Sequence, residues 1–309
     1  MPANVIEVQD LAVEYGRGKR RFRAVDGVTF RVAEGECVGF IGANGAGKSS
    51  TMKAIMGFLF PAAGHVRVFG EDAGTARSRQ RIGYLPEVAL YYPFMKAREL
   101  LELYGGLSGL TRVSLRKRIP EILDRVGLAG RAESLLRDFS KGMQQRLGIA
   151  QALIADPEAL ILDELSSGLD PIGRHDLRDV LMELRRRGRT IFFSSHELTE
   201  VESLCDRVII IHGGKIVTQA TVAELMRPLS EIEISFVTGN GSSLPASLTA
   251  LRPHVADGHG TLIVDSPTRC AEAILALSGA GCQVRRTSTR VRSLEDHFIE
   301  LVGATRRAP

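Results

Sequence analysis

An eight-residue glycine-rich loop constrains the fold of this chain more than any other feature. Residues 42–49 read Gly-Ala-Asn-Gly-Ala-Gly-Lys-Ser, which matches the pattern G-x-x-x-x-G-K-[ST] at every fixed position. The apolar run 38–41 before the loop predicts a buried strand, and the apolar spacing after it predicts a helix over 48–57. A strand, this loop and a helix in that order predict a phosphate-binding site in an α/β fold.

The residue types of the loop suit a polyanion. Its glycines let the backbone bend where a Cβ would clash, so that successive N–H groups converge on phosphate oxygens, and the helix start adds further N–H groups. We expect Lys48 to bind the β- and γ-phosphates of a nucleoside triphosphate and the Ser49 hydroxyl to bind Mg²⁺. A plain turn is the alternative, and the Lys-Ser pair argues against it. The residues assigned to nucleotide binding here are Gly42, Asn44, Gly45, Ala46, Gly47, Lys48, Ser49 and Ser50.

Two acids end a second predicted buried strand. Residues 159–162 form an unbroken apolar run, and Asp163 and Glu164 follow it. Open α/β sheets bind ligands at the carboxyl ends of their strands. We therefore expect Asp163 to bind Mg²⁺ and Glu164 to orient or deprotonate an attacking water. Two acids that merely end a strand at the surface are the alternative, which the presence of Lys48 in the same chain disfavours.

A segment between these motifs carries a family resemblance. Residues 139–146 read Phe-Ser-Lys-Gly-Met-Gln-Gln-Arg, and apolar residues at helical spacing follow. This segment resembles the signature of the ATP-binding cassette (ABC) ATPases, L-S-G-G-Q followed by Q-Q-R. The resemblance implies that Ser140 and Gly142 contact the γ-phosphate of ATP held by an opposite subunit. Lys141 and Met143 depart from the family pattern, but a serine at a helix N-terminus is still an anion site.

Two further positions resemble family residues, one that contacts the nucleotide and one that contacts the membrane partner. Tyr15 stands where the family has an aromatic residue, which implies that its ring stacks on adenine. Glu87 ends the sequence Tyr-Leu-Pro-Glu, at the place of a glutamine that reaches both Mg²⁺ and the membrane partner. This Y-L-P-E variant resembles the cassette subunits of export-type transporters whose permeases are encoded separately. We therefore also assign Glu87 to the metal site.

The resemblance continues beyond Glu164. Asp170 lies in a sequence similar to the loop that crosses the cassette dimer, although Leu165 replaces the usual proline. His196 follows a predicted strand over 190–195. The family places this histidine against the γ-phosphate and the catalytic acid, which implies a supporting catalytic role for His196 beside Glu164. A lone histidine at a surface or in a core is the alternative, and its place after a strand argues against it.

Composition and segment lengths bound the organisation of the chain. Its 309 residues, 44% of them apolar, suffice for one large α/β domain and a small one. No segment approaches a membrane-spanning length, and the N-terminus lacks the features of a secretory signal. We therefore expect a cytosolic protein that reaches the inner face of the cell membrane through a permease. The four isolated cysteines are expected to be free thiols.

Two stretches outside the motifs have competing interpretations. The basic run 17–23 is interpreted as a solvated hairpin, with contact to nucleic acid or to anionic lipid as alternatives. The apolar and aromatic stretch 88–95 either packs in the core or docks a permease helix, and we favour docking. After the second stretch, helical spacing of apolar residues between about 98 and 136 predicts a helical subdomain, which we place at about 96–155 and which includes the signature-like segment. Its apolar face includes Leu100, Leu101, Leu103 and Leu107.

These observations predict an α/β P-loop cassette over 1–228, with a mixed central sheet, an antiparallel β subdomain and a helical subdomain. A small α+β domain over 229–309 is expected to serve dimerisation or regulation. The resemblance implies an ATP-binding and ATP-hydrolysing transporter subunit that uses ATP and Mg²⁺ and powers export by ATP-driven dimerisation, as a homodimer or with a second cassette. No nucleic acid partner is expected. The alternatives are a soluble ABC ATPase acting on nucleic acid or the ribosome, and a non-catalytic regulatory cassette.

Overall fold

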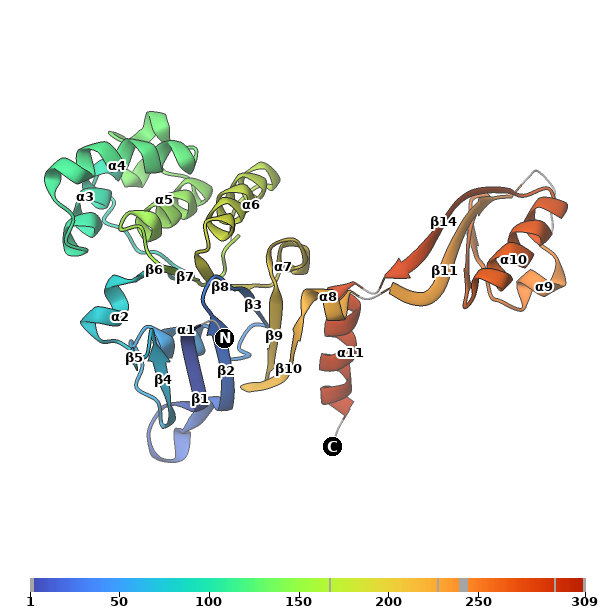
Figure 1. Cartoon of the computed structure of the whole chain (residues 1–309), viewed down its shortest axis with the longest axis horizontal. Coiled ribbons are helices and arrows are strands. Elements are labelled where there is room, and N and C mark those ends of the chain that lie inside the picture. The colour runs from blue at the N-terminus through green and yellow to red at the C-terminus, as the bar shows by residue number, and fades with distance from the viewer. Residues whose placement is uncertain (1–2, 167, 227, 239–243, 292, 308–309) are drawn as a thin grey trace. The chain divides into compact units, whose positions relative to one another are not determined.

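The chain divides into two compact units, Met1–Val222 and Ala223–Pro309. A computed structural model describes residues 3–166, 168–226, 228–238, 244–291 and 293–307 (Figure 1). Within these ranges no helix has the length and apolar character needed to cross a membrane. The four cysteines are free, as predicted, and all four are buried.

A six-stranded sheet forms the centre of the first unit, in the order β10-β9-β3-β8-β7-β6. Neighbouring strands are parallel except for β10, which pairs antiparallel with β9. The strands are β3 (Cys37–Ile41), β6 (Ile82–Leu85), β7 (Ala159–Leu162), β8 (Thr190–Ser195), β9 (Arg207–His212) and β10 (Lys215–Thr221). Every residue of β3, β7 and β8 is buried, which explains the unbroken apolar runs of β3 and β7, whereas β8 also buries Thr190, Ser194 and Ser195. Their carboxyl ends meet at one edge of the sheet and bring together the loops that follow them.

An antiparallel sheet packs against the central one, in the order β2-β1-β4-β5. Its strands are β1 (Asn4–Tyr15), β2 (Phe22–Ala33), β4 (Ala63–Val68) and β5 (Glu71–Asp72). The basic run lies where β1 turns into β2, through a short 3₁₀ helix over Gly18–Arg20, so the predicted hairpin is confirmed. Phe30 of β2 stacks on Phe192 of β8 with ring centroids 5.5 Å apart, and Phe40 of β3 lies 5.4 Å from Phe192. These buried rings join the two sheets in one core.

Helices complete the first unit (Figure 1). They are α1 (Lys48–Ile55), α2 (Ala76–Gln80), α3 (Ala97–Leu107), α4 (Arg112–Arg125), α5 (Lys141–Leu153), α6 (Pro171–Arg186) and α7 (Leu198–Leu204). The helix predicted over 48–57 thus ends two residues early. The predicted apolar face of α3 is partly wrong, because Leu103 and Leu107 are exposed. The buried stripe instead runs through Ala97, Leu100, Leu101 and Gly105. A Cβ on Gly105 would lie 2.3 Å from Leu115 of α4, so this glycine permits the close packing of α3 on α4.

The second unit is an α+β domain, as predicted. It begins with α8 (Val222–Leu225) and contains β11 (Pro228–Val237), α9 (Ala246–Thr249), β12 (His254–Ala256), β13 (His259–Val264), α10 (Pro267–Gly279), β14 (Gln283–Val291) and α11 (Leu294–Arg307). The strands form an antiparallel sheet in the order β12-β13-β11-β14. This is the β-α-β-β-α-β arrangement of ferredoxin-like folds. Its core includes Ile234, Phe236, Leu262 and Leu277. The Ser293 hydroxyl accepts the N–H of Asp296 and caps α11 as predicted.

Candidate nucleotide-binding and catalytic site

The loops that follow β1, β3, β6 and β7 surround a cavity of about 280 Å³. Its lining is Tyr15, Phe22, Ala24, Ala43, Asn44, Gly45, Ala46, Gly47, Lys48, Ser49, Ser50, Glu87 and Glu164. Most residues that the sequence assigns to nucleotide binding therefore lie together. Gly42 is close by, because its carbonyl oxygen accepts a hydrogen bond from the Lys48 ammonium.

The backbone of the glycine-rich loop has the shape that its composition predicts. Gly45 and Gly47 adopt φ angles of +77° and +109°, a region that other residues rarely enter. A Cβ on Gly47 would lie 2.6 Å from the carbonyl oxygen of Ala24, so a larger residue is excluded there for a second reason. Helix α1 begins directly afterwards at Lys48. Its first N–H groups lack helical partners and are available to an anion at the cavity.

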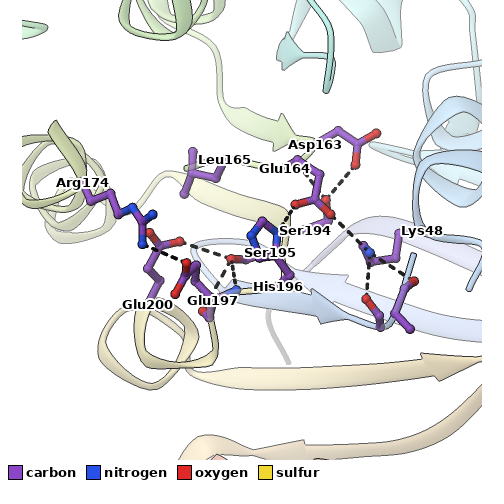
Figure 2. A network of polar contacts seen from close by, with 12 residues as sticks. Lys48, Asp163, Glu164, Leu165, Arg174, Ser194, Ser195, His196, Glu197 and Glu200 are labelled. Atoms are coloured by element: carbon purple, nitrogen blue, oxygen red, sulfur yellow. Dashed lines mark hydrogen bonds and ion pairs between the residues drawn. The ribbon is translucent and has the colours of Figure 1, made fainter. Parts of the chain in front are cut away.

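The Lys48 ammonium is buried between the loop and a carboxylate. Its side chain is 6% exposed, and Nζ donates to the carbonyl oxygen of Gly42 at 2.7 Å. The same atom lies 3.2 Å from Oε1 of Glu164. Figure 2 shows Glu164 between Lys48 and His196. A phosphate bound in the loop would contact the Lys48 ammonium together with the Glu164 carboxylate, so the carboxylate would lie next to the phosphate.

Ser194 ties the two acids to the neighbouring strand. Its hydroxyl donates to Oδ1 of Asp163 at 2.7 Å and accepts the N–H of Glu164 at 2.8 Å. All three residues are buried. Oε2 of Glu164 lies 2.6 Å from Nδ1 of His196, so the predicted pair of Glu164 and His196 is in hydrogen-bonding contact (Figure 2). Sequence analysis did not assign Ser194, although a serine in an otherwise apolar buried strand was a signal for it.

Two aromatic side chains stand at the other end of the cavity. Tyr15 and Phe22 are paired across the β1–β2 hairpin, and both line the cavity. The Tyr15 hydroxyl lies 3.1 Å from Oγ of Ser50, which places its ring beside the start of α1. Phe22 is 62% exposed. Sequence analysis did not assign Phe22, and its position opposite Tyr15 becomes visible only from the register of the hairpin.

The other predicted ATP contacts lie outside the lining described for this cavity. The Ser140 hydroxyl accepts the N–H of Met143 at 3.3 Å and caps α5. The Asp170 carboxylate accepts the N–H of Gly173 at 2.8 Å and caps α6. A Cβ on Gly142 would lie 3.4 Å from the carbonyl oxygen of Gly168, so the two loops are close neighbours. Ser140, Gly142 and Asp170 therefore belong to a second group of residues, apart from those of the glycine-rich loop.

Side-chain oxygens in and next to the cavity suit Mg²⁺: Ser49 and Glu87 line the cavity, whereas Asp163 is buried next to the lining residue Glu164 and is not part of the lining described. Ser49, Asp163 and Glu87 would supply a hydroxyl and carboxylate oxygens, the ligands that this hard cation prefers. Across the described ranges no group of three His, Cys, Asp or Glu residues could hold a metal ion by itself. The hydrogen bond from Ser194 fixes the orientation of the Asp163 carboxylate. Burial, aided by the charge of Asp163, raises the pKa of Tyr84 to about 12, so this neighbouring phenol stays neutral.

Comparisons with known proteins identify the family of this chain. Residues 25–167 match the family model described as ABC transporter. The chain is 40% identical over 313 residues to the bacitracin transport ATP-binding protein BcrA of Bacillus licheniformis, an alignment that covers 97% of this chain and 98% of that protein. It is 39% identical over 310 residues to the uncharacterized ABC transporter ATP-binding protein YxlF of Bacillus subtilis, covering 97% and 100%. A solved structure described as the ATP binding subunit of an ABC transporter superposes with a TM-score of 0.65, at 33% identity, over 72% of this chain and 91% of the other.

The chain therefore belongs to the ATP-binding proteins of ABC transporters. It is an ATPase with the predicted P-loop cassette fold, and it serves as the ATP-binding subunit of a transporter. Neither alternative predicted from the sequence, action on nucleic acid or a non-catalytic cassette, is favoured. Arg21 and Arg23 of the basic run both form ion pairs with Glu14 at 2.9 Å.

Proposed function

We propose that this ATPase powers export through a separate membrane permease at the inner face of the cell membrane. The observation that carries its catalytic part is the contact of Glu164 with both Lys48 and His196 beside the phosphate-binding loop. The bacitracin transport relative, which the chain matches almost end to end, supports a role in transport, and the Tyr-Leu-Pro-Glu sequence that ends at Glu87 resembles that of export-type subunits. The small C-terminal domain, residues 229–309, is proposed to serve dimerisation or regulation.

The residues of the cavity divide the work of hydrolysis. The N–H groups of the loop and the Lys48 ammonium bind the β- and γ-phosphates, and the Tyr15 ring stacks on the base. Ser49 and Asp163 would hold Mg²⁺, with Glu87 in the lining of the cavity, and this cation would neutralise developing charge on the phosphates. Glu164 orients the attacking water and accepts its proton. His196 holds the Glu164 carboxylate in place through the 2.6 Å contact.

ATP binding is proposed to join two cassettes. Ser140 and Gly142 lie at the N-terminus of α5, where a serine hydroxyl and backbone N–H groups form an anion site. Because these residues and Asp170 lie outside the lining of their own cavity, they are available to the nucleotide of an opposite subunit. That subunit is a second copy of this chain or another cassette. Hydrolysis then removes the charge that bridges the two subunits, and they separate.

The segment 88–95 is proposed to dock a permease helix. Leu90 is 89% exposed and Phe94 is 73% exposed, and Val88 and Tyr92 are exposed as well. Such a row of large apolar side chains is typical of an interaction surface. Glu87 of the cavity precedes the segment directly, and the hydroxyl of the half-buried Tyr91 donates to Gln151 of α5 at 3.5 Å. Movement of α5 or of Glu87 would therefore reach the docked helix.

Docking is tested by purification of the membrane complex. We expect Phe94→Ser combined with Leu90→Ser to abolish retention of the permease, whereas ATPase activity of the isolated subunit stays within twofold of the unmodified protein. The matched control is Leu107→Ser, which removes a leucine that is 75% exposed at the end of α3. Retention of the permease by the double variant at the level of the control would refute the docking surface.

The catalytic assignment is tested with Glu164→Gln, which keeps the shape of the side chain but removes the base. We expect turnover to fall by about 10² to 10³, typical of the loss of a positioned catalytic group. ATP binding is retained because Lys48 and the loop are unchanged, so the variant should accumulate as an ATP-bound dimer on a sizing column. A variant that hydrolyses ATP at the normal rate would remove Glu164 from the mechanism.

A further inference from the structure

The backbone of Glu164 is held in an unusual conformation by buried side chains on both sides. Its φ angle is +52°, in the left-handed region that residues other than glycine rarely adopt. Its N–H donates to Ser194 at 2.8 Å. On the other side, Nε2 of Gln145 donates to the carbonyl oxygen of Glu164 at 3.4 Å and to that of Leu165 at 2.8 Å. Such a conformation persists only where the surroundings fix it.

Gln145 links this backbone to the helix that begins at the signature-like segment. Its side chain is buried, and its Nε2 donates to both carbonyl oxygens. It lies in α5, five residues after the Ser140 cap, which corresponds to about 7.5 Å along a helix axis. A displacement of the N-terminus of α5 would therefore be transmitted to the carbonyl groups of Glu164 and Leu165.

We propose that Gln145 is a positioning residue that sets the direction of the Glu164 carboxylate from α5. Through it, the placement of the signature-like segment controls hydrolysis at the site of the same chain. Ser194 fixes the N–H side of the Glu164 backbone from β8, and Gln145 fixes the carbonyl side from the helical subdomain. The inference rests on the proposed catalytic role of Glu164. Gln145 itself acts through Glu164 and does not touch the phosphate-binding loop in any contact described.

The test removes the amide in two backgrounds. Gln145→Met keeps the length of the side chain but has no N–H groups, and it is measured in the unmodified protein and in Glu164→Gln. Single-turnover hydrolysis and the KM for ATP are determined for each. The control is Gln151→Ala, which removes a glutamine of the same helix whose described contact is with Tyr91. The control is expected to stay within twofold of its parent.

We expect Gln145→Met to lower the hydrolysis rate about tenfold in the unmodified protein, a loss of about 1.4 kcal/mol of transition-state stabilisation. The KM for ATP should change less than threefold because the loop and Lys48 are untouched. In the Glu164→Gln background the same substitution should change the rate less than twofold, since a residue that acts through Glu164 has nothing left to position.

Three results would overturn the inference. An equal loss in both backgrounds would show a general structural role, and an unchanged rate in the unmodified protein would show no role. Normal hydrolysis by Glu164→Gln alone would refute the role of Glu164 and the inference with it, so the two failures are distinguishable. If Gln145→Met does not fold, as judged by thermal unfolding, Gln145→Asn is measured in its place. Its side chain is one methylene group shorter, so its amide does not reach the two carbonyl oxygens, and the same results are expected.

Discussion

Removal of the Ser194 hydroxyl should damage both the stability and the chemistry of this ATPase. Ser194→Ala deletes a hydrogen bond of 2.7 Å to the charged Asp163 and leaves the buried N–H of Glu164 without its acceptor at 2.8 Å. A hydrogen bond to a charged group contributes about 1.5–3 kcal/mol, and an unsatisfied buried N–H costs about 1–3 kcal/mol. With partial relaxation, we expect the free energy of unfolding to fall by about 3 kcal/mol. We expect the turnover number to fall at least tenfold because both acids lose their orientation.

The neighbouring serine provides the control. Ser195 is equally buried on the same strand, but its hydroxyl accepts the N–H of Glu197 at 2.9 Å and donates to Glu200 at 3.2 Å. Ser195→Ala should therefore reduce stability but change turnover less than threefold. Urea unfolding gives the stability of each variant and a phosphate-release assay gives turnover. Equal turnover in the two variants would refute the assignment of Ser194 as the residue that orients Asp163 and Glu164.

Two further predictions concern the base site and pH. Tyr15→Ala should weaken ATP binding about tenfold, because a stacking contact worth about 1–2 kcal/mol is lost. Tyr15→Phe keeps the ring and should bind ATP with an affinity within threefold of that of the unmodified protein. Equal affinities of Tyr15→Ala and the unmodified protein, measured by calorimetry, would exclude stacking. Burial raises the pKa of Glu200, so the folded state binds this proton more tightly than the unfolded chain and loses stability as pH rises through the raised value. Glu200→Gln should therefore raise the melting temperature by about 2 °C at pH 8, with a gain that shrinks toward pH 5; a gain that grows as pH falls would contradict this sign.

The parts of the site that local sequence determines could be predicted. The glycine-rich loop needs its own residues to bend, and the apolar runs of β3 and β7 report burial on both faces of a sheet. Because both residues follow the carboxyl ends of such strands, Lys48 and Glu164 are expected at the same edge of the central sheet. The order of the motifs along the chain then identifies the family and, with it, the fold.

The rest depends on contacts between residues far apart in sequence. Ser194 reaches Asp163 across 31 residues and Gln145 reaches Leu165 across 20, and neither partner is visible in a local pattern. The positive φ of Glu164 has no local signal, because the surrounding hydrogen bonds impose it on a residue that does not favour it. The sequence wrongly placed Leu107 on the buried face of its helix for a related reason. The spacing of apolar residues shows which side of a helix is apolar, but it does not show how far the neighbouring helices extend along it.

The central claim is that Lys48 and the loop around it hold ATP, and calorimetric titration with ATP and Mg²⁺ tests it most directly. The account predicts that the unmodified protein binds ATP and that Lys48→Ala binds at least tenfold more weakly, since a charged hydrogen bond to phosphate contributes about 1.5–3 kcal/mol. Circular dichroism confirms that the variant is folded. Equal affinity of the two folded proteins, or no binding by the unmodified protein, would contradict the account.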